Sequence, residues 1–226
     1  AAVRWAGNLE EAATLAVSLA SGHTAEPPRE LSPAELDRLV EREARRISGE
    51  QRFLRGYFTG GTLGDEAMVL LHRPPFAVYS NNQTDPRYRL ADPRVSTGHT
   101  IVDLGDDAFT VGRPHPMIDP TTRTERILAE AADRQVAVVL VDVVLGHGSH
   151  PDPAGALAPA LAEARSAAAA RGGHLPVVAS VVGTPADPQD LAAQHAALER
   201  IGCLVMESSH RAAEVARRIV DEVSKR

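Results

Sequence analysis

The sequence predicts an α/β fold, in which a doubly wound, flavodoxin-like parallel sheet follows an N-terminal helical arm. From residue 51 onward, short apolar runs alternate with helical stretches, a pattern typical of parallel strands joined by helical crossovers. The runs are continuous in Val, Ile and Leu, which indicates a sheet covered on both faces. The expected strands are 53–58, 76–79, 100–104, 136–145, 175–182 and 203–206. The expected helices between and after them are 62–72, 120–133, 154–171, 188–201 and 211–223.

Residues 1–50 predict two helices that carry no obvious chemistry. Asn8 can cap the first helix, which ends at Gly22. The segment Ser-Pro-Ala-Glu at 32–35 is a capping box with proline at the first helical position, and it opens a second helix that continues to Gly49. We therefore expect a helical arm or connector over 1–50 and an α/β domain over 51–226.

Composition excludes several classes of function. The chain has 226 residues, 43% of them hydrophobic, and a net charge of −6, which argues against a nucleic-acid partner. No apolar run approaches the roughly 18 residues of a membrane span, so we expect no membrane partner and a cytoplasmic location. The single cysteine, Cys203, lies in an apolar run and is expected to be a buried thiol.

The stretch 53–73 predicts a strand, a glycine turn and a helix in succession. The first amides of a helix lack internal partners and lie at the positive end of its dipole, so they can bind an anion. Gly60, Gly61 and Thr62 are therefore the candidate phosphate-binding residues. The alternative is that Asp65 and Glu66, expected in the same first turn, satisfy the dipole without any ligand.

Polar loops follow the other strands, and ligands of such sheets bind beyond the carboxyl ends of the strands. Asp103 and Asp142 interrupt apolar strands, so each needs a cation or backbone donors, and pairing with Arg113 would suffice. A metal site built from His147 and His150 with nearby carboxylates is conceivable, but the spacing is irregular and we expect no metal. The further loop candidates are Asp106, Asp142, His147, Gly183 and Thr184.

Four segments resemble a known family. They are GGTLGDEAM, TIVDLGDDAFTVGRPHPMIDP, VVLVDVVLGHGSHPDPA and VVASVVGTPADPQ, in that order. They resemble the middle, flavodoxin-like domain of FdrA-type proteins, the acyl-CoA synthetase-like relatives of the succinyl-CoA ligase α subunit. The resemblance covers roughly residues 51–224, so 51–226 is expected to be a succinyl-CoA ligase-type domain.

The resemblance implies roles for particular residues. In the ligase relatives, the equivalent of Gly61 and Thr62 opens a helix that holds the phosphate of a phosphohistidine, and a glutamate matching Glu66 pairs with that histidine. Here the corresponding loop, 183–187, contains no histidine. His195 follows it, but shares a helical face with Leu191 and Leu198, which favours a packing role over a phosphoryl carrier. We therefore expect no ligase-type phosphohistidine.

FdrA-type proteins are linked to carbamoyl transfer, which implies a small anionic substrate such as carbamoyl phosphate. Under that hypothesis Arg113 binds phosphate or carboxylate and His115 polarises or protonates the leaving group. With Glu66 from the ligase resemblance, these are the candidate catalytic residues. The CoA-binding and nucleotide-binding domains of the ligases are not found in these 226 residues. We expect no cofactor bound by this chain itself, with CoA or phosphate reaching it through partner subunits or flanking domains.

The alternative function is a non-catalytic assembly module that retains the ligase fold. The sequence leaves open the acyl or carbamoyl acceptor, the partners, the oligomeric state, and whether the chain is a piece of a longer protein or is active alone.

Overall fold

The computed structural model describes residues 3–26 and 31–226, and it confirms the predicted α/β class. Six parallel strands form one sheet in the order β2-β3-β1-β4-β5-β6. Their bounds are β1 Phe53–Phe58, β2 Val78–Ser80, β3 His99–Asp103, β4 Val136–Val144, β5 Val177–Val182 and β6 Leu204–Met206. Each predicted strand therefore exists, within two residues at either end.

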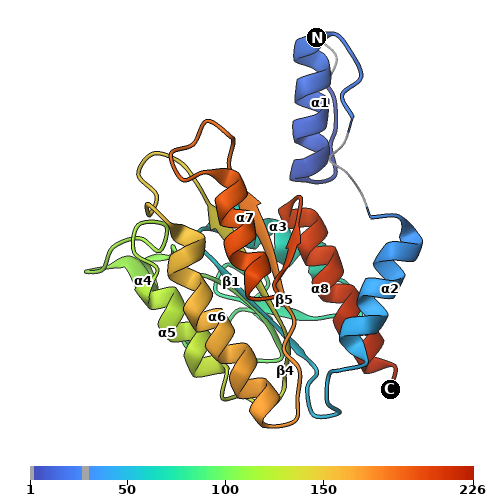
Figure 1. The fold of residues 1–226 in the computed structure, drawn as a ribbon, viewed down its shortest axis with the longest axis vertical. Helices are drawn as coiled ribbons and strands as arrows, with labels where there is room; N and C mark the ends of the chain where they lie inside the picture. The colour runs from blue at the N-terminus through green and yellow to red at the C-terminus, as the bar shows by residue number, and fades with distance from the viewer. Residues whose placement is uncertain (1–2, 27–30) are drawn as a thin grey trace.

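Helices cover both faces of the sheet (Figure 1). One face carries α3 (Gly61–Leu71) and α8 (Ser209–Ser224), with α2 (Pro33–Ala44) packed on α8. The other carries α5 (Thr121–Glu130), α6 (Pro153–Ala170) and α7 (Leu191–Arg200). Two apolar cores result, one on each side, and β4 between them is buried along almost its whole length. This double burial explains why the strands read as continuous apolar runs.

Strand β1 lies at the centre, between β3 and β4. From β1 the chain passes through α3 to β2 and β3 on one side, and then returns past β1 to β4 on the other. The carboxyl end of β1 is therefore the topological switch point, where ligands of doubly wound sheets bind.

Several predicted boundaries differ from the structure, including those of α5, which ends at Glu130 instead of 133, and α7, which begins at Leu191 instead of 188. The second strand begins at Val78 because the Phe76 amide is used in a turn, donating to the Arg73 carbonyl at 2.7 Å. Helix α2 ends at Ala44 instead of Gly49. The amides of Arg46 and Ile47 donate to carbonyls three residues earlier, a 3₁₀-type pattern that ends the α-helix. A short helix, α4 (Asp107–Thr110), was not predicted.

The two helices of the arm behave differently. Helix α2 is part of the body: Val40 and Ala44 are buried, and the Glu43 carboxylate meets Nε2 of His174 at 2.7 Å. Helix α1 (Leu9–Ser21) projects from the body (Figure 1), and although all of its residues are described, none is buried. The domain boundary near residue 50 stays a prediction.

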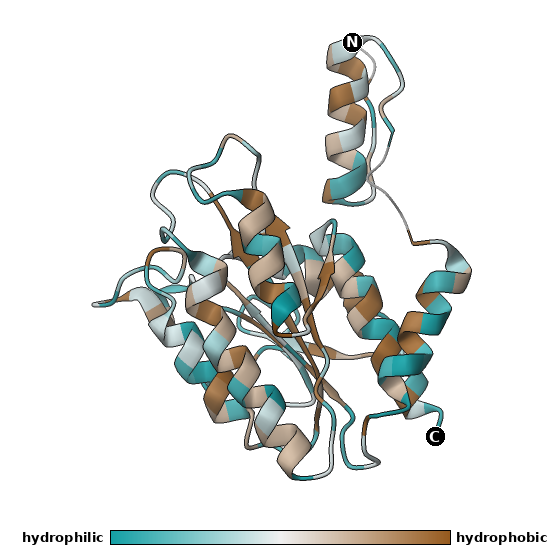
Figure 2. Ribbon diagram, viewed as in Figure 1, coloured by the Kyte–Doolittle hydropathy of each residue, from teal (hydrophilic) through white to brown (hydrophobic). Residues whose placement is uncertain are grey.

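The orientation of α1 is unusual for a helix of a globular protein. Its half-buried residues include a polar stripe of Glu10, Thr14 and Ser18, and Ser18 accepts the Ala25 amide of the returning chain at 2.8 Å. Its exposed residues include Leu9, and Leu19 is 60% exposed. Apolar residues of this helix, coloured brown in Figure 2, thus remain exposed, the reverse of the usual arrangement.

In the part of the chain that the structure describes, each helix is too short or too polar to traverse a bilayer.

Candidate functional site

The N-terminus of α3 lies at the carboxyl end of β1, as the sequence predicts. Gly60 takes the cap position with an extended backbone, and no side chain among the described residues caps the helix there. Gly60 and Gly61 are half-buried, while Thr62 is exposed. The first turn of α3 is therefore partly exposed, and its amides lie at the positive end of the helix dipole.

The expectation that Asp65 and Glu66 belong to the first turn was wrong. The helix begins at Gly61, so both carboxylates fall in its second turn. They do not cap the terminus, and the alternative in which they satisfy its dipole as caps is not supported.

Two carboxylates nevertheless lie beside the terminus. A Cβ on Gly61 would lie 3.2 Å from Oδ2 of Asp103 and 3.7 Å from Oδ2 of Asp65. Nδ2 of Asn82 bridges them, donating to Asp65 at 3.1 Å and to Asp103 at 3.2 Å. The missing side chain of Gly61 keeps this small space clear.

Asp103 is the more buried of the two carboxylates, with 8% of its surface exposed. Its Oδ1 accepts the Gly105 amide at 2.8 Å. Burial raises the pKa of Asp103, and the nearby carboxylates of Asp106 and Asp65 raise it further, while the bonds from Gly105 and Asn82 oppose the shift. This carboxyl group therefore takes up a proton more readily than an exposed aspartate.

His115 lies at the same edge of the sheet. A Cβ on Gly105 would lie 2.7 Å from Nε2 of His115, 2.9 Å from the Thr59 carbonyl and 3.1 Å from Oδ1 of Asp103. Because Nδ1 of His115 accepts the Met117 amide at 3.3 Å, Nε2 of the neutral ring carries the hydrogen. His115 thus brings a proton donor to the neighbourhood of Asp103 and the loop that leads into α3.

Asp142 stabilises the loop between β1 and α3. Its fully buried carboxylate accepts the Thr59 amide at 3.0 Å and the Thr59 hydroxyl at 2.5 Å. It also pairs with Arg123 at 2.9 Å, where the side chains are 0% and 4% exposed. The expectation that Arg113 would pair with Asp103 or Asp142 was wrong, because the cation comes from α5 and Asp103 is satisfied by amide donors. Asp142 therefore positions Thr59, the residue that precedes Gly60.

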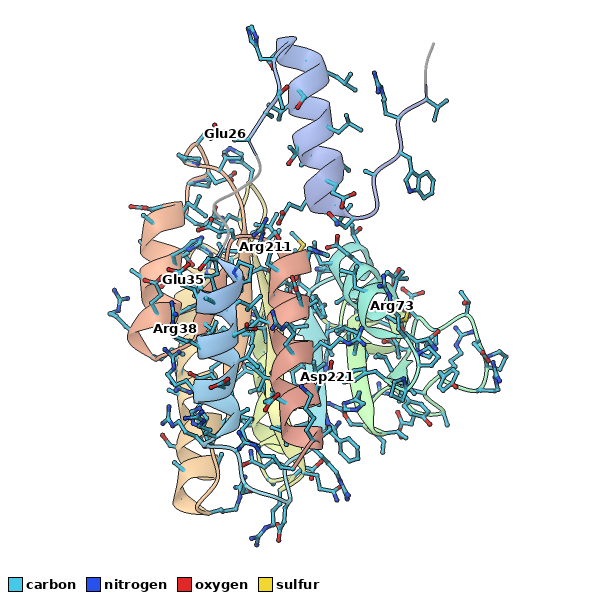
Figure 3. All side chains as sticks on the ribbon, turned by 90° about the vertical axis from the view of Figure 1, so that its right-hand side faces the viewer. Glu26, Glu35, Arg38, Arg73, Arg211 and Asp221 are labelled. Carbon is cyan, nitrogen blue, oxygen red and sulfur yellow. The ribbon has the colours of Figure 1, made fainter. Side chains whose placement is uncertain are left out.

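Glu66 faces the arm. Its Oε1 accepts the amide of Leu9, the first residue of α1, at 2.8 Å, and its Oε2 accepts the hydroxyl of Ser209 at the start of α8. Beside it, Glu10 of α1 accepts from Nε of Arg211 at 2.7 Å (Figure 3 labels Arg211). Glu66 is thus engaged in holding α1 onto the beginnings of α3 and α8.

The structure does not bring the remaining candidates to the terminus of α3. Arg113 is exposed and makes a long contact of 3.4 Å with Glu125. Asp106 caps α4 by accepting the Ala108 amide at 2.8 Å. His147 is exposed, and the amide of the exposed Thr184 donates to Asp187 at 2.6 Å. A Cβ on Gly183 would lie 2.7 Å from the Leu145 side chain, so this glycine serves packing.

Asn82 and Arg123 were missed by the sequence analysis. Asn82 follows β2, so its place after an apolar run was a usable signal. Arg123 gave none, since it lies in a charged helix and its burial depends on the packing of α5 against the sheet. Within residues 3–26 and 31–226, no group of three or more His, Cys, Asp or Glu is arranged to hold a metal ion.

The fold and this edge define a doubly wound α/β domain with an uncapped helix terminus at its topological switch point. Residues 57–219 match the CoA-ligase family, and the chain belongs to that family. It is also 45% identical, over 175 residues, to a protein of Escherichia coli (strain K12) described as "Uncharacterized protein YahF". The match covers 77% of this chain and 34% of that protein, so the chain spans about a third of the relative's length.

Proposed function

We propose that this chain is the ligase-type domain of an FdrA-like acyl-CoA synthetase-like or carbamoyl-transferring enzyme. It binds phosphate, or the phosphate group of an acyl or carbamoyl phosphate, at the N-terminus of α3. The reaction proceeds without a phosphohistidine, since the loop 183–187 has no histidine. Flanking domains or partner subunits supply CoA and the acceptor.

The observation that supports this proposal is the uncapped terminus of α3. Gly60 has no side-chain cap, Gly61 leaves space before it, and both are partly open to solvent. The two nearby carboxylates oppose an anion, and because burial raises the pKa of Asp103, this opposition weakens as the pH falls toward that pKa. The neutral ring of His115 then polarises the leaving group through a hydrogen bond from Nε2, and the imidazolium form transfers its Nε2 proton and returns to the neutral ring.

A titration tests the proposal. We expect phosphate and carbamoyl phosphate to bind in calorimetry and CoA to bind weakly or not at all. Gly61→Val should weaken phosphate binding at least tenfold, because charge-assisted hydrogen bonds contribute about 1.5–3 kcal/mol each. The Cβ of the valine would lie 3.2 and 3.4 Å from side-chain atoms of Asp103 and Asn82, so these side chains must shift, and circular dichroism checks that the variant is folded.

Gly49→Ala is the matched control, since a Cβ there meets nothing within 4 Å and the residue lies outside this edge. Equal phosphate affinity in the two variants, with both folded, would refute the proposed site.

The second candidate function is an assembly module, and the exposed apolar surface of α1 favours it. Val17 is 57% exposed and Leu19 60% exposed, on a helix attached through Glu66 and Arg211. Under this alternative Glu66 orients an interaction helix instead of acting in catalysis. Loss of self-association or partner binding in Leu19→Lys, with phosphate affinity unchanged, would favour the module.

A further inference from the structure

Arg113 lines a second pocket, away from the N-terminus of α3. The pocket has a volume of about 340 Å3 and is formed by the loop around Arg94, the short helix α4 and the outer side of α5. Three arginines line it: Arg94, Arg113 and Arg126. One carboxylate, that of Glu125, lines it as well, so cations outnumber anions here although the chain has a net charge of −6.

Much of the hydrogen-bonding capacity of these arginines is not used by the protein. Arg94 donates to the Ala108 carbonyl at 2.6 Å, but its ion pair with Asp92 is 4.0 Å long. Arg113 reaches Glu125 at 3.4 Å and Thr122 at 3.5 Å, both at the limit of a hydrogen bond. Each guanidinium carries five N–H donors, so both retain donors for a ligand.

Arg126 differs, since its side chain is 10% exposed, its Nη2 meets Ser96 at 2.7 Å and Glu130 at 2.8 Å, and its Nη1 donates to the Arg94 carbonyl. Its Nε is nevertheless buried without a partner among the described residues. A buried N–H without an acceptor costs free energy, and such exceptions in a folded protein require an explanation.

Apart from Thr122 and Glu125, the rest of the pocket lining is apolar. Ala108, Phe109, Val111 and Ala129 line it, and the guanidinium of Arg94 lies 5.6 Å from the centre of the Phe109 ring. Val111 is 80% exposed at its edge. An apolar wall beside forked cationic donors matches a ligand with one anionic and one apolar end.

We propose that this pocket binds a small organic anion, a carboxylate or phosphate ester that carries an aromatic or other apolar group. The anionic group is held by Arg94 and Arg113, and the apolar group lies against Phe109 and Val111. The inference is independent of phosphate binding at α3, because no residue is shared between the two sites.

Phenyl phosphate and inorganic phosphate are suitable probes, compared by ligand-observed NMR and calorimetry on the whole chain. We expect phenyl phosphate to bind more tightly than phosphate. Arg94→Gln and Arg113→Gln should each weaken phenyl phosphate about tenfold, the size of one charge-assisted contact. Ala129→Phe, at an exposed position of α5 that lines the pocket, should block binding while leaving every charge in place.

Arg134→Gln is the matched control, because Arg134 is 63% exposed and Arg113 57% exposed, and each is paired with one glutamate. It should change affinity less than twofold. Gly61→Val should leave the preference for phenyl phosphate intact, which separates this pocket from the α3 site. The proposal is overturned if the arginine variants match Arg134→Gln, or if the phenyl group gives no gain in affinity.

Discussion

The buried pair of Arg123 and Asp142 yields the sharpest prediction. Both charges are almost fully withdrawn from water, and Asp142 also carries the hydrogen bonds to Thr59. Arg123→Met would leave a buried carboxylate with no cation beside it. Breaking one partner of such a pair typically costs about 3–5 kcal/mol, a large fraction of the roughly 5–15 kcal/mol that stabilises a domain.

Urea unfolding followed by circular dichroism measures this loss. Asp142→Asn should also destabilise strongly, because it leaves Arg123 charged and buried. The double variant should lose much less than the sum of the two, since it removes both charges together. Weakened phosphate binding in Arg123→Met, in folded protein, would further indicate that Thr59 has shifted.

A control comes from the pair of Arg134 and Glu50, which has the same separation of 2.9 Å but is 63% exposed on both sides. Arg134→Met should cost under about 1 kcal/mol. If Arg123→Met costs no more than this control, or if the double variant is additive, the reasoning about buried charge is refuted.

Two further predictions concern carboxylates with shifted pKa values. Because burial raises the pKa of Asp103, phosphate affinity should increase as the pH falls toward that pKa. Asp103→Asn should bind phosphate roughly tenfold more tightly at pH 7, because it removes a charge whose repulsion is about 1–2 kcal/mol. Calorimetry across pH tests this, and a variant with the same pH profile as the parent protein would contradict it. The hydrogen bond from Arg211 lowers the pKa of Glu10 below its usual 4.5, so their contact contributes fully above that value and is lost as the pH falls through the lowered pKa. Acid, or Glu10→Gln at neutral pH, should therefore loosen the attachment of α1. The fluorescence anisotropy of Trp5, the single tryptophan, should decrease as a result. Equal anisotropy in Glu10→Gln and the parent protein at both pH values would contradict this prediction.

The sequence predicted what depends on local pattern. The strands were identified because their burial on two faces leaves a continuous apolar signature, and α3 was identified because its glycines lie between a strand and a helix. The cap of α1 at Asn8 and the capping box of α2 are confirmed for the same reason: both are satisfied within four residues.

What the sequence could not predict depends on contacts between distant residues. Glu66 was assigned through family resemblance, yet its direction is set by α1, 57 residues earlier in the chain. Arg113 and Arg123 look alike in the sequence, but the packing of α5 buries only the second of them against Asp142. Convergence of side chains at a sheet edge is a tertiary property that spacing alone does not encode.

The central position of β1 also determines how the chain must fold. As the first strand of the sheet to be synthesised, β1 has a vacant edge until β4 arrives. Gln51, just before β1, bonds to Val136 and His174, at separations of 85 and 123 residues. Such long-range pairing requires closure of large loops before it yields any stabilisation, so we infer slow folding in which late segments complete the earliest strand. A nascent chain that stops short of β4 would leave this edge of β1 unpaired and open to aggregation.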